Sequence, residues 1–453
     1  MIMKKYATLL LCILILSLAV TLFASCGKDK STTDLTTDPV TTGKPETSTE
    51  ATTEKPSVTT PESTTPATTE KPREPATPGL TYTSLGNGLC SVSGILDAGA
   101  EKLVIPEKNS KGEFVVSIEK DAFALNTKIK ELILYGASEE IGSSAFYGCT
   151  SLEKVTLESK TRTISSSAFR SCTALAEVNL SAGIETVDVS AFNGCSSLKI
   201  LTVDPENKTY RAEGNCLIKG DTVVIGCIGS VIPESVSKIG PFAFDGMNIS
   251  TPVLPGTVKS VGEQAYANNP FTLVKLPEGL ETLGDAVFYN CQQLTSVSLP
   301  ASLKTVGKRL FQACLRVEEL TVAKESESFY AEGVCLIEKE SGTLLQGVRL
   351  STIPEGVKKI GDYAFYGAMV KSLTVPEGVT EIGERAFYNC AYLTELTIPA
   401  SVKKLADDAL AKCDALTTIT YDGVEADWNM LTATATIPEG VTVHFLKEET
   451  PVA

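Results

Sequence analysis

A repeat of 22 or 23 residues constrains the fold of this 453-residue chain more than any other feature. Four phenylalanines, each preceded by alanine, recur 23 residues apart at Phe123, Phe146, Phe169 and Phe192. Beyond them, the same column continues through Phe244, Tyr266, Phe288, Phe311, Phe365, Phe387 and Leu410, which gives eleven units. Self-similarity of this length is typical of a solenoid, in which each unit buries its apolar residues only against its neighbours.

Each unit combines two local patterns. The alternation of Leu152, Val155 and Leu157 predicts a short β-strand, because residues two apart lie on the same side of a strand. The preceding Ala145-Phe146-x-x-Cys149 segment predicts a helical turn on the other side of the unit. The sequence therefore predicts an α/β-type repeat with one strand per unit.

The motif Gly142-x-x-Ala145-Phe146-x-x-Cys149-x-x-Leu152-x-x-Val155-x-Leu157 recurs at residues 382–399. It resembles the BspA-type, or Treponema-type, leucine-rich repeat of bacterial surface proteins, over about residues 80–445. The resemblance implies a curved, right-handed leucine-rich repeat solenoid with a parallel β-sheet on the concave face and short helical turns on the other side.

Residues 1–25 have the pattern of a secretory signal. Two lysines precede the uncharged, mostly apolar run from Ala7 to Ala24. The small residues Ala24 and Ser25 before Cys26 resemble the lipobox of bacterial lipoproteins, which implies lipid attachment at Cys26 and a membrane anchor on the extracellular face. An uncleaved anchor is the alternative, because the run of 18 apolar residues is long enough to cross a bilayer.

Composition divides the rest of the chain. Residues 26–78 are rich in Thr, Pro, Glu, Lys and Ser and are predicted to form a disordered stalk, whose glycosylation the sequence leaves open. We expect an N-terminal cap at 79–117, repeats at 118–421 and a C-terminal cap at 422–453, in which Trp428 anchors the cap. Two similar insertions, near 204–232 and 323–353, are each predicted to form a β-hairpin that projects from the solenoid.

Seven of the 13 cysteines share one column of the repeat, at Cys149, Cys172, Cys195, Cys291, Cys314, Cys390 and Cys413. Asn126, Met247, Asn269 and Ala368 occupy the same column in other units. This range suits a buried position of limited size, so we expect free buried thiols. Disulfides or a metal site remain alternatives, because adjacent units would bring the sulfur atoms close together.

Between the two inward residues of each strand lies one outward position, which forms a polar column along the sheet. The candidate binding residues in this column are Thr156, Asn179, Thr202, Ser298, Thr321, Thr374, Thr397 and Thr420. The alternative is a solvated face that reflects the high strand propensity of threonine.

The charge and the single histidine exclude several function classes. With 40 basic and 55 acidic residues the formal net charge is −15, which disfavours nucleic acid as a partner. His444, the only histidine, cannot supply a multi-histidine metal site. No sequence feature distinguishes a pair of Asp or Glu residues as the two carboxylates of a glycosidase. We therefore expect no enzyme, no metal and no cofactor.

The resemblance implies protein binding, either adhesion or another interaction, by a monomer anchored to the cell surface. Its partners would be host or bacterial surface proteins, with glycans as a further class. The alternatives are an envelope scaffold for other surface proteins and, less favoured, a carbohydrate-binding or carbohydrate-active protein.

Overall fold

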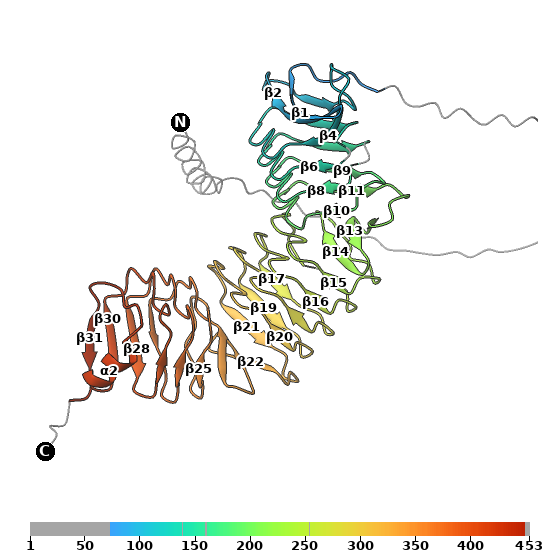
Figure 1. Ribbon diagram of the computed structural model, residues 1–453. Helices are drawn as coiled ribbons and strands as arrows, with labels where there is room; N and C mark the ends of the chain where they lie inside the picture. The colour runs from blue at the N-terminus through green and yellow to red at the C-terminus, as the bar shows by residue number, and fades with distance from the viewer. Residues whose placement is uncertain (1–72, 138, 159–160, 253, 449–453) are drawn as a thin grey trace, which may run out of the picture. The chain divides into compact units, whose positions relative to one another are not determined.

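The computed structural model describes residues 73–448 except 138, 159–160 and 253, and all of them belong to one compact unit, Lys71–Ala453 (Figure 1). The predicted signal, the lipidation site Cys26 and the stalk up to residue 72 lie outside the described residues. The unit is a parallel β-solenoid of about 15 turns with almost no helix, which confirms the predicted leucine-rich repeat fold. No helix among the described residues is long and apolar enough to cross a membrane.

One side of most turns carries a strand of three to five residues, and parallel pairing of neighbouring strands of this kind forms what we call the long-strand ladder. Its first run consists of β3 (Lys102–Ile105), β5 (Glu131–Leu134), β7 (Lys154–Leu157), β9 (Glu177–Leu180) and β11 (Ile200–Val203). The second run is β17 (Leu273–Lys275), β19 (Ser296–Leu299) and β21 (Glu319–Val322). The third is β26 (Ser372–Thr374), β28 (Glu395–Pro399), β30 (Thr418–Asp422) and β31 (Thr442–Phe445).

Two-residue strands form a second parallel ladder, which we call the short-strand ladder. After β4 (Phe114–Ile118) it contains β6 (Glu140–Ile141), β8 (Thr163–Ile164) and β10 (Thr186–Val187). It resumes with β15 (Lys238–Ile239), β16 (Ser260–Val261), β18 (Thr282–Leu283) and β20 (Thr305–Val306), and then with β25 (Lys359–Ile360), β27 (Glu381–Ile382) and β29 (Lys404–Leu405). Backbone hydrogen bonds in the two ladders therefore connect successive turns at two places.

The Ala-Phe segment of each unit supplies a third set of hydrogen bonds between turns. The backbone N–H groups of Ser144, Phe146 and Gly148 donate to carbonyl oxygens of the next turn at 2.8–3.0 Å. Ser144 and Gly148 have φ values of +56° and +67°, which lie in the left-handed region and interrupt a right-handed helix. This is why the segment forms hydrogen-bonded turns where we expected a helical turn.

The core consists of columns in which equivalent residues of successive turns contact each other. The rings of Phe123, Phe146, Phe169 and Phe192 stack in sequence, with centroids 5.1–5.3 Å apart. All seven cysteines of the predicted column are also buried. In each of them the thiol donates to the carbonyl oxygen of the aromatic residue one turn earlier, at 3.0–3.4 Å.

The two insertions have the same three-stranded structure. The first contains β12 (Arg211–Glu213), β13 (Cys216–Lys219) and β14 (Thr222–Ile225), and the second contains β22 (Phe329–Glu332), β23 (Cys335–Glu338) and β24 (Thr343–Gln346). The strands pair antiparallel within each insertion, but β14 and β24 then pair parallel with β15 and β25. Our prediction that the hairpins project was therefore wrong: Leu217 and Ile218 are fully buried, and a projecting hairpin would expose them.

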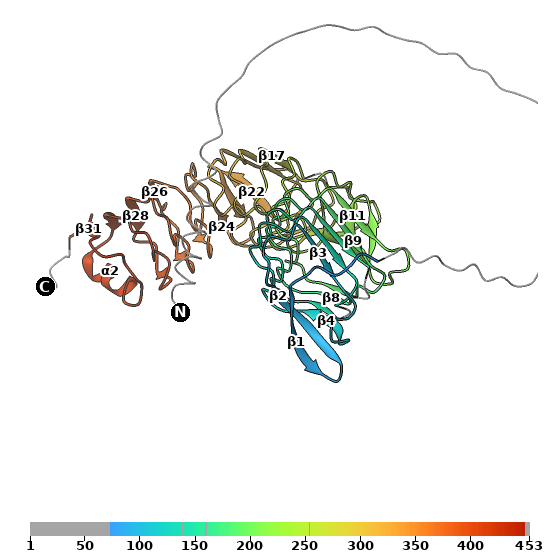
Figure 2. The same ribbon diagram turned by 90° about the horizontal axis from the view of Figure 1, so that it is seen from above.

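Both ends of the described solenoid carry added elements. At the N-terminal end, β1 (Leu80–Gly86) pairs antiparallel with β2 (Leu89–Ile95), and this hairpin extends beyond the adjacent turns (Figure 2). At the other end, α2 (Glu425–Leu431) presents Trp428, which is 5 % exposed and packs against Tyr421 with ring centroids 5.3 Å apart. Trp428 thus occupies the position of a cap anchor.

Candidate binding surface

The outward side of the long-strand ladder, which we call the long-strand face, carries all eight predicted binding residues. Parallel pairing places each of them opposite its equivalent in the next strand, as in Thr156 opposite Asn179 and Asn179 opposite Thr202. All eight are half-buried or exposed, while their neighbours along each strand are mostly buried. They lie on β7, β9, β11, β19, β21, β26, β28 and β30, in that order.

The structure divides this predicted column into three runs, because the long-strand ladder is interrupted at both insertions. Lys275 begins the second run, opposite Ser298, and is exposed. His444 ends the third run, where β31 pairs in parallel with β30 and places His444 opposite Thr420. We did not expect His444 on this face, although the alternation in Thr442-Val443-His444-Phe445 has the pattern of a strand.

The N-terminal end of the long-strand face is covered by residues 74–77, which precede the N-terminal cap. The Thr77 amide donates to the Val104 carbonyl oxygen at 3.1 Å, and the Thr77 hydroxyl accepts from the Val104 amide at 2.7 Å. The Tyr135 hydroxyl accepts from the Glu74 amide at 3.2 Å. The outward residues Val104 and Ile133 are consequently buried, so the accessible face begins at Thr156.

Two residues earlier in each strand lies a second outward column, which carries charges of alternating sign on β3, β5, β7 and β9. Lys154 lies 2.8 Å from Glu177, and Lys102 lies 3.1 Å from Glu131. Lys154 and, secondarily, the Asn179 amide hold the pKa of Glu177 below its ordinary value. In the first column, Asn179 is oriented by this neighbour, because its side-chain amide donates to Glu177 at 2.8 Å.

A surface hollow of about 560 Å³ lies at the end of the first run and includes two of the predicted residues, Asn179 and Thr202. The Thr202 hydroxyl donates to the Asn179 side-chain oxygen at 2.5 Å. Glu158 and Asp204 give the rim a negative charge, and Leu157 and Pro205 add apolar surface. This combination of shape, hydrogen-bonding groups and apolar contacts suits an interaction surface.

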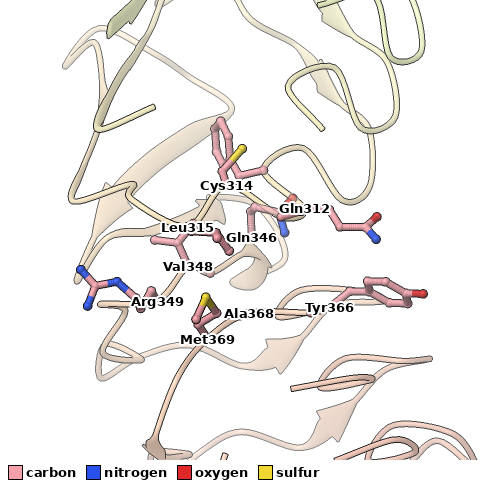
Figure 3. Close-up of a pocket in the computed structure, with 13 residues that line it drawn as sticks. Gln312, Cys314, Leu315, Gln346, Val348, Arg349, Tyr366, Ala368 and Met369 are labelled. Atoms are coloured by element: carbon pink, nitrogen blue, oxygen red, sulfur yellow. The ribbon is translucent and has the colours of Figure 1, made fainter. Parts of the chain in front are cut away.

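A narrower cavity next to the second insertion is structural (Figure 3). It encloses about 10 Å³, which is too little for a ligand. The buried Gln346 side chain beside it accepts a hydrogen bond from the Leu310 amide at 2.5 Å and donates to the Ala364 carbonyl oxygen at 3.0 Å. Gln346 therefore joins the turns before and after the insertion.

Among the described residues there is neither a metal-binding cluster nor an exposed thiol, which are two common kinds of reactive site. Across residues 73–448, apart from the four undescribed positions, no group of three or more His, Cys, Asp and Glu side chains is placed to hold a metal ion. The eleven described cysteines are all buried, and burial raises the pKa of Cys195 to about 12. At neutral pH such a thiol stays protonated and is a poor nucleophile.

Several solved structures of bacterial leucine-rich repeat proteins are similar to this chain. A leucine-rich cell surface protein from Faecalibacterium prausnitzii is 21 % identical over 81 % of this chain and all of its own, with a TM-score of 0.37. A leucine-rich repeat protein from Bacteroides ovatus is 17 % identical over 83 % of this chain and all of its own, with a TM-score of 0.36. The pneumococcal vaccine antigen PcpA is 16 % identical over 83 % of this chain and 88 % of its own, with a TM-score of 0.33.

A comparison with curated proteins gives no significant match. The family model for the BspA type leucine rich repeat region, in contrast, matches six copies at residues 101–215, 228–332 and 347–426. These ranges cover more than half of the chain and contain the Phe and Cys columns and all eight predicted binding residues. The chain therefore belongs to the BspA-type leucine-rich repeat family.

Proposed function

We propose that this protein is a binding module of the bacterial cell surface that interacts with other proteins through its long-strand face. The observation that carries the proposal is the register of the outward polar residues, which aligns the eight candidates in three runs on one side of the solenoid. The rows present hydroxyl and amide groups, and in the first run paired charges flank them, which favours specificity over non-specific attraction. The hollow at Asn179 and Thr202 adds shape to this otherwise shallow surface.

Attachment through a lipidated Cys26 is part of the proposal. A stable anchor of this kind would hold the solenoid outside the membrane, with the Thr/Pro-rich segment between them. Cys26→Ala should release the protein from the membrane fraction of cells that express the full chain. Persistent membrane attachment of this variant would instead favour an uncleaved apolar anchor at residues 7–24.

The binding role can be tested with beads that carry the full chain. We expect them to adhere to surfaces coated with host extracellular-matrix proteins, and to do so better than beads coated with an unrelated acidic protein. If the beads adhere to no matrix protein but retain a protein from bacterial envelope extracts, the envelope-scaffold function is supported. If they bind a glycan array and neither class of protein, the carbohydrate-binding alternative replaces both.

A further inference from the structure

The N-terminal hairpin leaves one edge of a β-sheet open. β1 is the first strand of the six-stranded sheet β1-β2-β4-β6-β8-β10, so only one of its two sides is paired, with β2. Among the described residues, no other backbone group forms a hydrogen bond with the open side of β1. The hairpin extends beyond the adjacent turns, and a Cβ added at Gly86 or Gly88 would meet no atom within 4 Å (Figure 2). The open edge is therefore accessible.

This edge lacks the usual protection against pairing with another strand. Natural sheets commonly protect an edge with charged residues, with proline or by making the edge strand short. β1 has seven residues, as many as any strand in the described part of the chain, and it contains neither a charge nor a proline. Glu113 and Glu119 flank β4, two strands away, and hydroxyl groups of β1 and β2 donate to their carboxylates. The edge is therefore uncharged in a chain whose net charge is −15.

The backbone of β1 presents its free groups in a regular order. The Leu96 amide donates to the Gly79 carbonyl oxygen at 2.8 Å, so the backbone of Gly79 points toward β2. Successive residues of a strand direct their backbone groups to opposite sides. The groups on the open side therefore belong to every second residue, Leu80, Tyr82 and Ser84. One register irregularity adds Ser93 to β2 and the other lies at Leu85, so this order is unbroken and symmetric about Tyr82.

The side chains of β1 also leave one layer of the core unfinished. Leu80 and Tyr82 lie on the same side of the strand and pack against the core, but both remain half-buried. Val92, which pairs with Tyr82 from the inner strand β2, is fully buried. Another strand with apolar residues on this side would continue the layer and cover Leu80 and Tyr82.

We propose that β1 pairs with β1 of a second copy of this chain, antiparallel and centred on Tyr82, so that one continuous sheet joins two solenoids. Twofold symmetry brings identical surfaces together, and the order of backbone groups about Tyr82 is its own complement. Thr81 then lies opposite the partner's Thr83, a favourable cross-strand pair, and no like charges face each other. The sequence led us to expect a monomer, whereas this edge favours a dimer. The dimer is independent of binding through the long-strand face.

Cysteine cross-linking on cells that express the full chain tests this pairing. Tyr82→Cys would place two thiols at the symmetry axis with Cα atoms about 5.5 Å apart, within the range of a disulfide. After treatment with copper phenanthroline, this variant should form a covalent dimer on a non-reducing gel. The wild type, whose described cysteines are buried, should not. Neither should Thr163→Cys on β8, which is paired on both sides. Absence of a dimer from folded Tyr82→Cys would overturn the proposal.

Two further variants keep the tyrosine and differ only at position 81. Thr81→Lys with Thr83→Lys would set lysine opposite lysine across the symmetry axis, whereas Thr81→Glu with Thr83→Lys would set glutamate opposite lysine. Each is co-expressed as two full-length copies with different tags, and recovery of the second tag with the first is measured in detergent. Melting curves serve as the control for folding.

We expect recovery to fall at least tenfold for the lysine–lysine variant and to equal or exceed that of the wild type for the glutamate–lysine variant. Equal recovery from the two folded variants would contradict pairing through β1. So would a wild type that recovers no second copy. Recovery of a different protein in its place, lost in the lysine–lysine variant, would replace the second copy with that protein as the occupant of the edge.

Discussion

The thiol of Cys195 donates a hydrogen bond to the carbonyl oxygen of Phe169, one turn earlier in the solenoid, at 3.2 Å. The same contact recurs along the whole cysteine column. Where Asn269 replaces cysteine, its side-chain amide donates to the Phe244 carbonyl oxygen at 2.7 Å. Apart from Met247 and Ala368, the members of this column therefore combine a small side chain with a donor group, which accounts for the cysteines without a disulfide or a metal.

Cys195 should resist alkylation in the native protein. Burial raises its pKa to about 12, so at pH 8 the reactive thiolate is scarce, and the side chain is fully buried. Iodoacetamide at pH 8, followed by mass spectrometry, should label Cys195 only after denaturation. All eleven described cysteines should be labelled in denaturant without a reductant. Fewer labelled cysteines would show that disulfides had formed.

Phe146→Ala should lower the free energy of unfolding by about 3 to 5 kcal/mol, because it removes a fully buried ring from the aromatic stack and leaves a cavity. Tyr147→Ala, at the next and only half-buried position, is the matched control and should cost less. Urea denaturation followed by circular dichroism measures both. A wild-type-like Phe146→Ala variant would show that the assigned register of the repeat is wrong.

Gly226→Ala should be destabilising by about 1 to 3 kcal/mol or more, because an added Cβ would lie 1.8 Å from a ring carbon of Phe244. The Gly256→Ala control places its Cβ no closer than 3.8 Å to the nearest atom and should be close to neutral. Melting temperatures of the two variants give the comparison. Equal melting temperatures would contradict the packing of the first insertion against Phe244.

Asp245→Asn should raise the melting temperature at pH 7 and have little effect below about pH 4. Burial raises the pKa of Asp245 above its ordinary value of 3.8, against the opposing effects of Asn268 and, more weakly, Arg170. As the pH rises, the Asp245 carboxyl group therefore loses its proton at a lower pH in the unfolded chain than in the folded protein. The folded wild type consequently loses stability as the pH rises above 3.8. Asparagine keeps an oxygen that can accept the 2.6 Å hydrogen bond from Asn268.

Melting curves between pH 4 and pH 8 test this pH dependence. The control is Asp414→Asn, at an exposed position, which should change the melting temperature little at either pH. A gain for Asp245→Asn that is the same at both ends of this range would contradict a raised pKa at Asp245.

The parts of the fold that follow from the repeat could be predicted from the sequence. The Phe146 and Cys149 columns and the outward position of Thr156 depend only on the period and on strand alternation, so they hold from one turn to the next. Contacts outside the period could not be predicted in the same way. The pairing of β14 with β15 joins an irregular insertion to a regular turn, and the cover provided by Thr77 comes from a segment whose composition indicates disorder.

Single departures from the pattern also escaped prediction. His444 lies beyond the last unit recognised by its phenylalanine column, and only its pairing register with Thr420 places it on the long-strand face.

The binding role of the long-strand face is tested most directly by two variants with the same change in charge. One replaces Thr156, Thr202, Thr321 and Thr397 with lysine, and the other replaces Thr163, Thr186, Thr282 and Thr305 on the short-strand ladder. Each set contains two exposed and two half-buried threonines. The measurement is the affinity of each full-length variant for the protein partner identified in the bead-adhesion experiment. Melting curves serve as the control for folding. We predict a loss of at least tenfold for the long-strand variant and wild-type affinity for the short-strand variant, whereas equal affinities of the two folded variants would contradict binding through this face.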